Sequence, residues 1–304
     1  MFGSSVWSVY ALVLLAAVLW GAAPVLTKLG LNRGAGPRQA VLTVLAADTV
    51  AVWVALLAVY GPSAVDQLAT LDARFLALFA VTGALGTGLG RLVGLVGIDR
   101  LGASIYAAAL SVRPLFATVL GVALLGEAIE ALTVGGVVVL VVGLVVLERS
   151  REHGGGETGG WNTRDLAFPL LAAAAYAVSR VLRRVGMQAE EVAALEAVAT
   201  NELAGLLVLG TLLVGWYGRD VLDVPRASVP YFVANGVCIA AGMVAVFTAL
   251  AAPGGRVVVV DPLVATVPLF TAGFAAVSLD TERVTARVVV GAVLVVVGAV
   301  LVVW

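Results

Sequence analysis

The chain has few of the residues that cross-links and metal sites require. Its 304 residues contain one cysteine, Cys238, and one histidine, His153. A single cysteine cannot form a disulfide within the chain, and these two residues are too few for a Cys/His zinc site. We therefore expect no disulfide framework, no metal and no cofactor.

Charge is also scarce. Only 12% of the residues are Asp, Glu, Lys or Arg, whereas soluble domains contain about 25%, and 62% are hydrophobic. The formal net charge of -1 gives no reason to expect a nucleic-acid partner, because phosphate binding requires clustered cations that face solvent. The composition is that of a polytopic membrane protein.

Sequence motifs of enzymes are missing. The chain has no glycine-rich phosphate loop ending in Lys-Ser or Lys-Thr and no zinc-binding helix. His153 is far in sequence from every candidate nucleophile. These absences argue against an enzyme and against a pump that hydrolyses ATP.

Ten apolar segments are long enough to cross a bilayer. A hydrocarbon core about 30 Å thick needs about 20 apolar residues in a helix. The sequence therefore predicts an all-α integral membrane protein with ten transmembrane helices. The segments cover residues 8–31, 39–60, 74–97, 102–125, 130–148, 166–187, 193–216, 229–251, 255–278 and 285–304.

One sequence pattern occurs twice, about 155 residues apart. Pro114-Leu115-Phe116 aligns with Pro268-Leu269-Phe270, and Glu127 aligns with Glu282. Such self-similarity indicates a duplicated architecture. Further aligned pairs are Gly136 with Gly291, Gly143 with Gly298, Trp20 with Tyr176, and Lys28 with Arg184.

A polar, glycine-rich stretch divides the predicted helices into five and five. Residues 149–165 contain Gly154-Gly155-Gly156 and are expected to form a flexible linker between residues 1–148 and residues 166–304. Because five is odd, the second half must enter the membrane from the opposite side. We therefore predict two inverted five-helix repeats, an architecture in which the site of a transporter lies at the repeat interface.

Three short motifs resemble those of a known family. Trp20-Gly21 followed by Lys28, then Gly102-Ala103-Ser104, then Pro114 followed by Gly126-Glu127, occur in this order. The pattern resembles the EamA-like branch of the drug/metabolite transporter superfamily over essentially the whole chain. The resemblance implies a secondary transporter, often an exporter of amino acids or other small metabolites, with a central cavity between the halves. It also implies a multi-pass protein of the cell membrane, whose partners are a small solute and lipid.

The chain departs from this family pattern at several positions. The second half has Tyr176-Ala177 where the first has Trp-Gly, and Leu279-Asp280-Thr281-Glu282 stands where Leu-Gly-Glu is expected. Arg91 and Arg113 carry charge inside the third and fourth segments, where the family pattern is mostly neutral. These departures leave the fold intact and the class of solute open.

Charged residues inside the apolar segments are the candidate functional residues, because a charge at mid-membrane is costly unless function or a partner requires it. Lys28 lies near a helix end, where its long side chain is expected to reach the headgroups, as do Arg183, Arg184 and Arg256. The candidates are Asp48, Arg91, Arg113, Arg180, Glu196, Glu202 and Asp261.

Arg113 and Asp261 form the first candidate pair. Each precedes a proline, Pro114 or Pro262, in the corresponding fourth and ninth helices. A proline in a spanning helix frees a backbone carbonyl, and an inverted repeat could bring both charges to one interface. The pair could clamp a zwitterion, or it could be a structural salt bridge, or the two charges could never meet.

The second group consists of Asp48 and Glu202, which lie at roughly matched positions in the second and seventh helices. They could pair with Arg91 and Arg180, or bind and release a proton during transport. We therefore assign proton coupling to Asp48 and Glu202. Solute binding is assigned to Arg113, Asp261, Arg91, Trp20 and Tyr176.

The third segment carries a packing signal. Gly86, Gly90 and Gly94 are spaced four residues apart, a pattern that allows close approach of neighbouring helices.

Two alternatives to a carrier of small polar metabolites stay open. The intramembrane arginines favour a carrier for a larger anionic solute, such as a nucleotide-sugar or sugar-phosphate. A membrane enzyme or lipid-linked scaffold would require a catalytic cluster at one membrane face, and the sequence contains no such cluster.

We expect Asp261→Asn to abolish or strongly reduce transport while folding and membrane insertion persist. The amide keeps the size of the side chain but removes its charge and its proton. If Asp261 instead only neutralises Arg113, the variant loses stability, and Asp261→Asn combined with Arg113→Gln recovers part of it. Efflux and thermal stability of both variants separate these outcomes, and normal transport by the single variant would exclude Asp261 from the site.

Overall fold

The computed structural model describes residues 6–70, 72–110, 112–113, 116, 120, 131–149, 162–189, 194–251, 264, 266–279 and 285–303. Every regular element within these residues is a helix. A helix closes its backbone hydrogen bonds within one segment, which suits a lipid environment where no water is available to the backbone.

The first half contains helices at the predicted segments and one short extra helix, α3. The third segment is divided into three consecutive elements. The elements are α1 (Val6–Leu31), α2 (Pro37–Tyr60), α3 (Ser63–Ala69), α4 (Ala73–Thr82), η1 (Gly83–Gly90), α5 (Arg91–Leu101), α6 (Ala103–Leu110) and α8 (Ala131–Arg149).

The second half repeats the long helices, with short 3-10 turns before α9 and after α10. Its elements are η3 (Thr163–Leu166), α9 (Ala167–Ala189), α10 (Ala194–Tyr217), η4 (Gly218–Leu222), α11 (Val229–Ala251), α13 (Val267–Ser278) and α14 (Ala286–Val303).

The third segment is not the uniform α-helix that the sequence suggests. Between α4 and α5, η1 is a π-helix whose sequence, GALGTGLG, contains four glycines. Glycine has little preference for the α-helical conformation, and π-type turns occur most often at functional sites. Arg91 directly follows this element as the first residue of α5.

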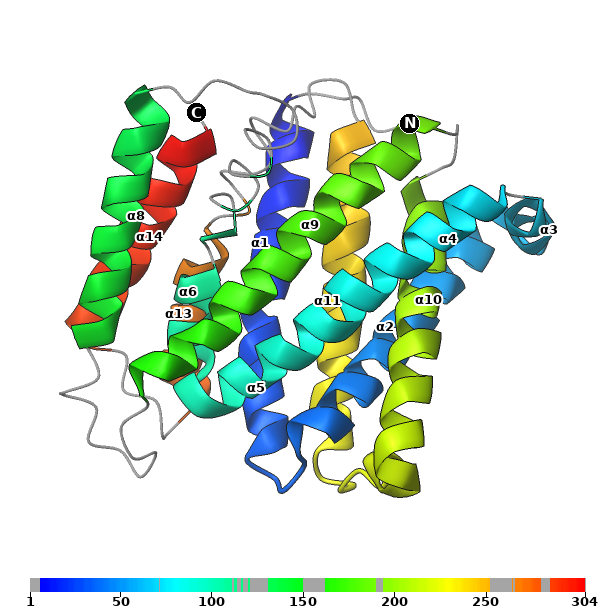
Figure 1. The fold of residues 1–304 in the computed structure, drawn as a ribbon, viewed down its shortest axis with the longest axis horizontal. Helices are drawn as coiled ribbons and strands as arrows, with labels where there is room; N and C mark the ends of the chain where they lie inside the picture. The colour runs from blue at the N-terminus through cyan, green and yellow to red at the C-terminus, as the bar shows by residue number, and fades with distance from the viewer. Residues whose placement is uncertain are drawn as a thin grey trace.

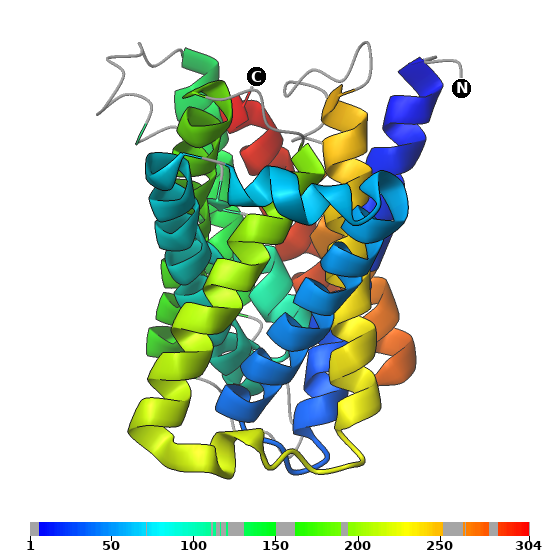
Figure 2. The same cartoon turned by 90° about the vertical axis from the view of Figure 1, so that its right-hand side faces the viewer.

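The helices form an elongated bundle (Figure 1). α1 begins and α14 ends at the same end of the bundle (Figures 1 and 2). α9 runs beside the continuous α4–η1–α5 segment and contacts all three of its elements. α8 and α14 pack against each other along one edge.

Contacts in the bundle recur in reciprocal pairs. A methyl group on Gly143 of α8 would overlap Val295 of α14, and a methyl group on Gly298 would overlap Leu140. Gly298 follows Gly143 by 155 residues, and Val295 follows Leu140 by 155 residues. Each contact is therefore the counterpart of the other. Reciprocity of this kind is the property of a two-fold axis.

A second reciprocal pair lies deeper in the bundle. A methyl group on Gly83 of η1 would overlap the Asn201 carbonyl oxygen, and one on Gly236 of α11 would meet Ala47 and the Asp48 amide. Gly236 and Asn201 follow Gly83 and Ala47 by 153 and 154 residues. α10 therefore approaches η1 in the way that α2 approaches α11.

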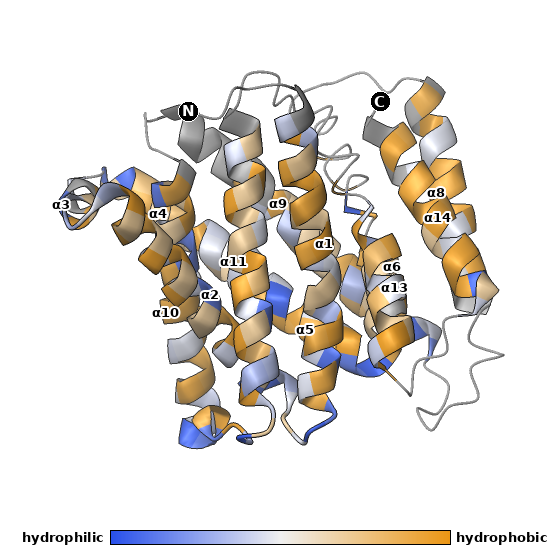
Figure 3. Ribbon diagram, turned by 180° about the vertical axis from the view of Figure 1, so that it is seen from behind, coloured by the Kyte–Doolittle hydropathy of each residue, from blue (hydrophilic) through white to orange (hydrophobic). Residues whose placement is uncertain are grey.

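Hydrophobic residues predominate along the helices of the bundle (Figure 3). Large hydrophobic residues such as Leu15, Val54 and Val277 are exposed there, as suits contact with lipid. Five described helical segments are long and apolar enough to span a membrane, so the chain is a multi-pass membrane protein. They are Ser8–Leu31, Pro37–Tyr60, Ala73–Leu101, Leu195–Leu222 and Val229–Val246; shorter apolar helices cover Val134–Gly143, Val267–Ser278 and Ala286–Gly298.

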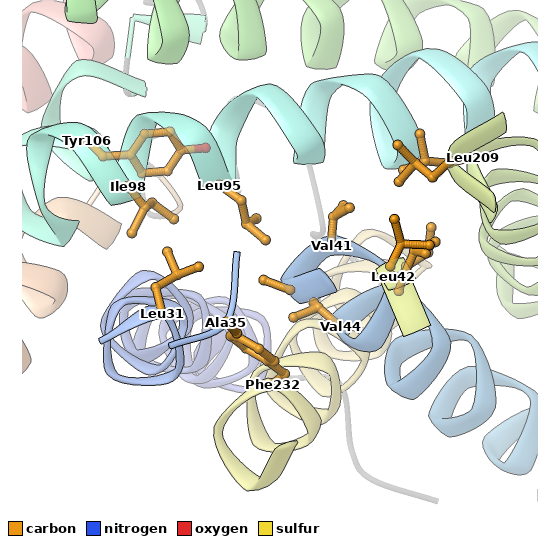
Figure 4. Close-up of a cluster of buried hydrophobic side chains, with 14 residues drawn as sticks. Leu31, Ala35, Val41, Leu42, Val44, Leu95, Ile98, Tyr106, Leu209 and Phe232 are labelled. Carbon is orange, nitrogen blue, oxygen red and sulfur yellow. The ribbon is translucent and has the colours of Figure 1, made fainter. Parts of the chain in front are cut away.

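A buried hydrophobic cluster includes residues near the end of α1 and the starts of α2 and α11 (Figure 4). It joins the end of α1 at Leu31 to the start of α2 at Leu42 and to the start of α11 at Phe232. Ile98 of α5 and Leu209 of α10 complete it. The cluster therefore includes helices from both halves of the chain.

Lys28 lies near this cluster and does not extend to the membrane surface. It is 5% exposed, and its Nζ donates a hydrogen bond of 2.7 Å to the backbone carbonyl of Asp99. The same Nζ lies 3.7 Å from Asp99 Oδ1. The expectation that Lys28 reaches the headgroups is wrong, because Asp99 near the end of α5 supplies both a carbonyl and a carboxylate.

The end of the predicted linker has a defined structure. Asn162 Oδ1 accepts a hydrogen bond from the Arg164 amide, and Asp165 Oδ2 accepts one from the Asn162 amide, which caps η3. Arg100 Nη1 lies 3.1 Å from Asp165 Oδ1 and ties the end of α5 to the start of α9. Residues 150–161 of the linker lie outside the described residues.

We expect Gly143→Ala to destabilise the protein and Gly135→Ala, in the same helix, to leave it unchanged or slightly more stable. The added methyl at Gly143 meets the backbone and side chain of α14, and overpacking typically costs about 1–3 kcal/mol. A methyl at Gly135 meets no atom within 4 Å. Thermal unfolding in detergent measures both, and equal stability of the two variants would contradict the close approach of α8 and α14.

Candidate functional site

Three charged side chains meet inside the bundle. Asp48 of α2 and Glu202 of α10 are fully buried, and Arg91 at the start of α5 is 8% exposed. Arg91 Nη1 lies 2.8 Å from Asp48 Oδ2, and Arg91 Nη2 lies 3.5 Å from Glu202 Oε2. We call these three residues the charge cluster.

The helices that carry the cluster explain why it forms. Asp48 and Glu202 each stand mid-way along a long apolar helix, where neither carboxylate can reach water. Arg91 directly follows η1, and the glycines of η1 let α10 approach at Gly83 and Gly205. Pairing is then the main way to offset the cost of burying these charges.

Glu202 is also held by a neutral hydrogen-bond network. Its Oε1 accepts hydrogen bonds of 3.2 Å from the Thr87 hydroxyl and 3.2 Å from Asn201 Nδ2. Asn201 Nδ2 donates to Thr87 Oγ1 at 2.8 Å, and Asn201 Oδ1 accepts from the Thr82 hydroxyl at 2.8 Å. The network fixes the orientation of the Asn201 amide and anchors Glu202 to η1.

α9 joins this network through Ser179. Its hydroxyl donates a hydrogen bond of 3.0 Å to the backbone carbonyl of Thr82, the residue before η1. A π-helix leaves backbone carbonyls less regularly paired than an α-helix does, so this contact stabilises the junction between α4 and η1.

The other polar atoms of the cluster are incompletely satisfied. Among the described residues, no neutral side chain donates a hydrogen bond to Asp48 Oδ1, Asp48 Oδ2 or Glu202 Oε2. The described contact of Asp48 with Arg91 is the ion pair at 2.8 Å. Thr49 Oγ1, next in sequence, is also buried without a partner. Buried polar groups are usually paired, so such exceptions mark a place for water, an ion or a ligand.

The cluster has an imbalance of charge. Two carboxylates face one guanidinium, which leaves one negative charge uncompensated when all three groups are ionised. In a low-dielectric interior this charge favours binding of a proton or another cation.

Two tyrosines adjoin the cluster. Tyr176 of α9 lies against Gly90, and Tyr106 of α6 lies against Gly94, where added methyl groups would contact the rings. The two tyrosine side chains lie close enough to interact electrostatically. The prediction of close packing at these glycines is confirmed, with tyrosine rings in the space that they leave.

Arg113 belongs to the same electrostatic surroundings. It interacts with both tyrosines, as Arg91 does. The structure thus brings together Asp48, Arg91, Glu202, Tyr176 and Arg113 from the sequence-based candidates. Their roles in solute binding and proton coupling stay predictions.

Trp20 lies apart from them, on α1. Its indole N–H donates a hydrogen bond of 3.2 Å to the backbone carbonyl of Ile239, and its ring lies against Gly242 of α11. The packing of Trp20 on Gly242 is the counterpart of the packing of Tyr176 on Gly90. Tyr176 follows Trp20 by 156 residues, and Gly242 follows Gly90 by 152 residues. Equivalent aromatic rings thus pack on glycines in both halves.

Several predicted site residues are not tested. Asp261 lies outside the described residues, as do Pro262, Glu127 and Glu282, so the Arg113–Asp261 pair stays a prediction. Nothing is described of the Arg180 side chain, and the described partner of Glu202 is Arg91.

Sequence reasoning missed the neutral residues of the site. Thr87, Asn201 and Tyr106 carry no charge, and the uncharged residues selected from the sequence were Trp20 and Tyr176, from the aligned openings of the two halves. The available signals were the position of Asn201 directly before Glu202 and that of Thr87 within a glycine-rich segment. Asn235 was also missed; its Nδ2 donates to Thr27 Oγ1 at 2.6 Å. Among the described residues, no group of three or more His, Cys, Asp or Glu could hold a metal ion.

We expect Arg91→Gln to lower the free energy of unfolding by about 3–5 kcal/mol, the usual cost of leaving a buried charge without its partner. Adding Asp48→Asn removes one of the two repelling carboxylates and should recover part of the loss. Thermal unfolding of the wild type, the single variants and the double variant measures this coupling. An Arg91→Gln variant as stable as the wild type would contradict an ionised cluster.

Twenty-two chains of solved structures match this chain. One of them, titled only "Crystal structure of protein", aligns with a TM-score of 0.64 at 18% sequence identity and covers 98% of each chain. At this identity the likeness shows the fold alone. No curated protein matches.

The family comparison gives a more specific result. Residues 7–149 match the family described as "EamA-like transporter family". This match covers α1 to α8, including Asp48 and Arg91 of the charge cluster. Proteins of this family are membrane transporters and generally not enzymes. Residues 7–149 therefore form an EamA-like transporter family domain, within a chain that is a multi-pass membrane protein.

Proposed function

We propose that the protein is a gradient-driven secondary transporter of the cell membrane that exports a small polar metabolite, such as an amino acid. The solute would pass between two five-helix halves, residues 1–148 and 166–304, related as inverted repeats across ten spans. The reciprocal glycine contacts of α8 with α14, and of η1 with α10 and α11 with α2, support this two-fold relation.

The observation that carries the proposal is the charge cluster. Asp48 and Arg91 lie in the first half and Glu202 in the second, and all three are buried within apolar helices. Ionisable residues at such depth mark solute or ion pathways in membrane proteins. Their position between the halves is where the sites of inverted-repeat transporters occur.

The charge balance favours a solute that carries an amino group. Arg91 already faces two carboxylates, so the cluster has excess negative charge and offers no free cation to an anion. A zwitterion could place its ammonium near Asp48 and its carboxylate toward Arg113, beside Tyr176 and Tyr106.

The second candidate is a carrier for a larger anionic solute, such as a sugar-phosphate. It is favoured by the electrostatic contact of both Arg91 and Arg113 with the tyrosine pair. If the carboxylates were protonated, the two arginines would present positive charge to such a solute. The two candidates therefore differ in the sign of the charge that the site accepts.

We expect the protein reconstituted in liposomes to exchange a radiolabelled zwitterionic amino acid in counterflow assays. The panel should contain zwitterionic, cationic and anionic amino acids, sugar-phosphates and nucleotide-sugars. Empty liposomes and the Gly135→Ala variant serve as the background and the matched control. Exchange of the phosphorylated solutes alone would favour the second candidate, and exchange of none would contradict the proposed class of solute.

A further inference from the structure

The two carboxylates of the charge cluster have different surroundings. Glu202 Oε1 accepts hydrogen bonds from Thr87 and Asn201, and these two donors are themselves fixed by their mutual hydrogen bond. Asp48 is fully buried and lies 2.8 Å from Arg91 Nη1, but among the described residues no neutral side chain donates a hydrogen bond to it. Donors directed at a carboxylate favour its ionised form, whereas a carboxylate without donors in an apolar interior favours the neutral acid.

The charged and titratable groups facing Asp48 are few. Arg91 faces it from α5, Glu202 from α10, and Tyr176 of α9 lies beside Arg91, together with Tyr106 and Arg113. η1 contributes none, since its sequence is GALGTGLG. Other titratable residues on the elements packed against α2 have other partners or lie exposed. They are Lys28 with Asp99, Tyr231 with Arg33, Tyr217 with Arg38, the partly exposed Cys238, Glu196 toward the start of α10, and the exposed Asp66, Asp220 and Arg219.

The balance of charges in the cluster favours the binding of one proton. With both carboxylates ionised, Arg91 is the partner of two anions, and the cluster has a net charge of one negative unit. One bound proton makes the cluster neutral, while a second would leave the buried guanidinium unpaired, which is again costly. Uptake of one proton is therefore the favourable change.

We propose that Asp48 is the carboxyl that takes up and releases the coupling proton, while Glu202, held by Thr87 and Asn201, is the permanent partner of Arg91; this rests on the proposed function. On uptake, the proton binds an Asp48 oxygen and cancels the charge of its ion pair with Arg91. Arg91 then has Glu202 as its only anionic partner. On release, the proton leaves Asp48 and Arg91 again faces both carboxylates.

The proton thereby acts on the relation between the two halves. Asp48 lies in α2, in the same half as Arg91, whereas Glu202 lies in α10 of the other half. When Asp48 is neutral, the electrostatic attraction of Arg91 is to Glu202 in the other half. When Asp48 is ionised, Arg91 is attracted both to Asp48 in its own half and to Glu202. The proton therefore changes how strongly the first half holds the second, and an ammonium group of a solute can replace the proton at Asp48.

Infrared difference spectra of the purified protein between acidic and alkaline buffers test the proton site without transport. We expect the band of a weakly hydrogen-bonded carboxylic acid in the wild type, in Gly135→Ala and in Glu202→Gln, and its loss in Asp48→Asn. In wild-type protein, isotopically labelled aspartate should shift this band and labelled glutamate should not, which keeps the test valid if a variant fails to fold. Absence of the band in the wild type, or its loss in Glu202→Gln, would overturn the assignment.

Transport by the same variants tests the coupling. With the zwitterionic amino acid that gives the largest counterflow, the wild-type rate should change with pH. The rate of Asp48→Asn should be independent of pH and resemble the acidic limit of the wild type, because the amide imitates the protonated acid. An imposed proton gradient should drive accumulation about tenfold less in this variant, an ordinary loss of coupling free energy.

Three outcomes of the transport assay are decisive. The transport rate of Glu202→Gln should still depend on pH. If instead the rate of Glu202→Gln is independent of pH and the rate of Asp48→Asn depends on pH, Glu202 and not Asp48 is the proton-coupling residue. Accumulation driven by a sodium gradient but not by a proton gradient would overturn proton coupling. If the wild type exchanges no solute, the proposed function fails, and the infrared spectra still decide whether Asp48 binds a proton.

Discussion

The ion pairs of Arg91 constrain much of the surrounding structure. A guanidinium buried among apolar helices must meet anions, and here they are Asp48 of α2 and Glu202 of α10, which are 154 residues apart in sequence. To hold both carboxylates, the start of α5 has to lie between these helices. η1 makes this possible, because its small residues let α10 come close while its hydroxyl at Thr87 binds Glu202. The position of one charge thus explains an otherwise costly irregularity in a spanning helix.

Packing of the bundle depends on glycines for a related reason. Lipid is as apolar as a leucine side chain, so helices in a membrane gain little from hydrophobic burial and associate where backbones or rings fit closely. Gly143, Gly298, Gly83 and Gly236 supply such contacts between backbones, and Gly90 and Gly242 receive aromatic rings. Because these contacts occur in reciprocal pairs, the packing of one half repeats that of the other, while the charged residues do not repeat with the same regularity.

The helical segments could be predicted from sequence because a bilayer imposes length and apolar composition on each span, and the described helices lie at the predicted positions. The buried charges were visible for the same reason. The π-helix was not, since glycines permit many conformations and the contact with α10 selects one. Lys28 was misjudged because its partner Asp99 follows 71 residues later. Asn201 and Thr87 escaped notice because neutral polar residues are ordinary in spanning helices, and only the fold shows that they bind Glu202.

The combination of repeated packing and unequal chemistry bears on how such a transporter works. If the two halves are inverted repeats that exchange conformations, as proposed above, the protein has two states that are nearly equal in packing, one open to each side. Residues that break the equivalence then decide which state is preferred. Asp48 and Glu202 occupy matched positions, but Glu202 is held by Thr87 and Asn201, whereas Asp48 has only the ionic contact with Arg91. A ligand that changes the charge of Asp48 therefore shifts the balance between the two states, because it binds one side of an otherwise symmetric arrangement.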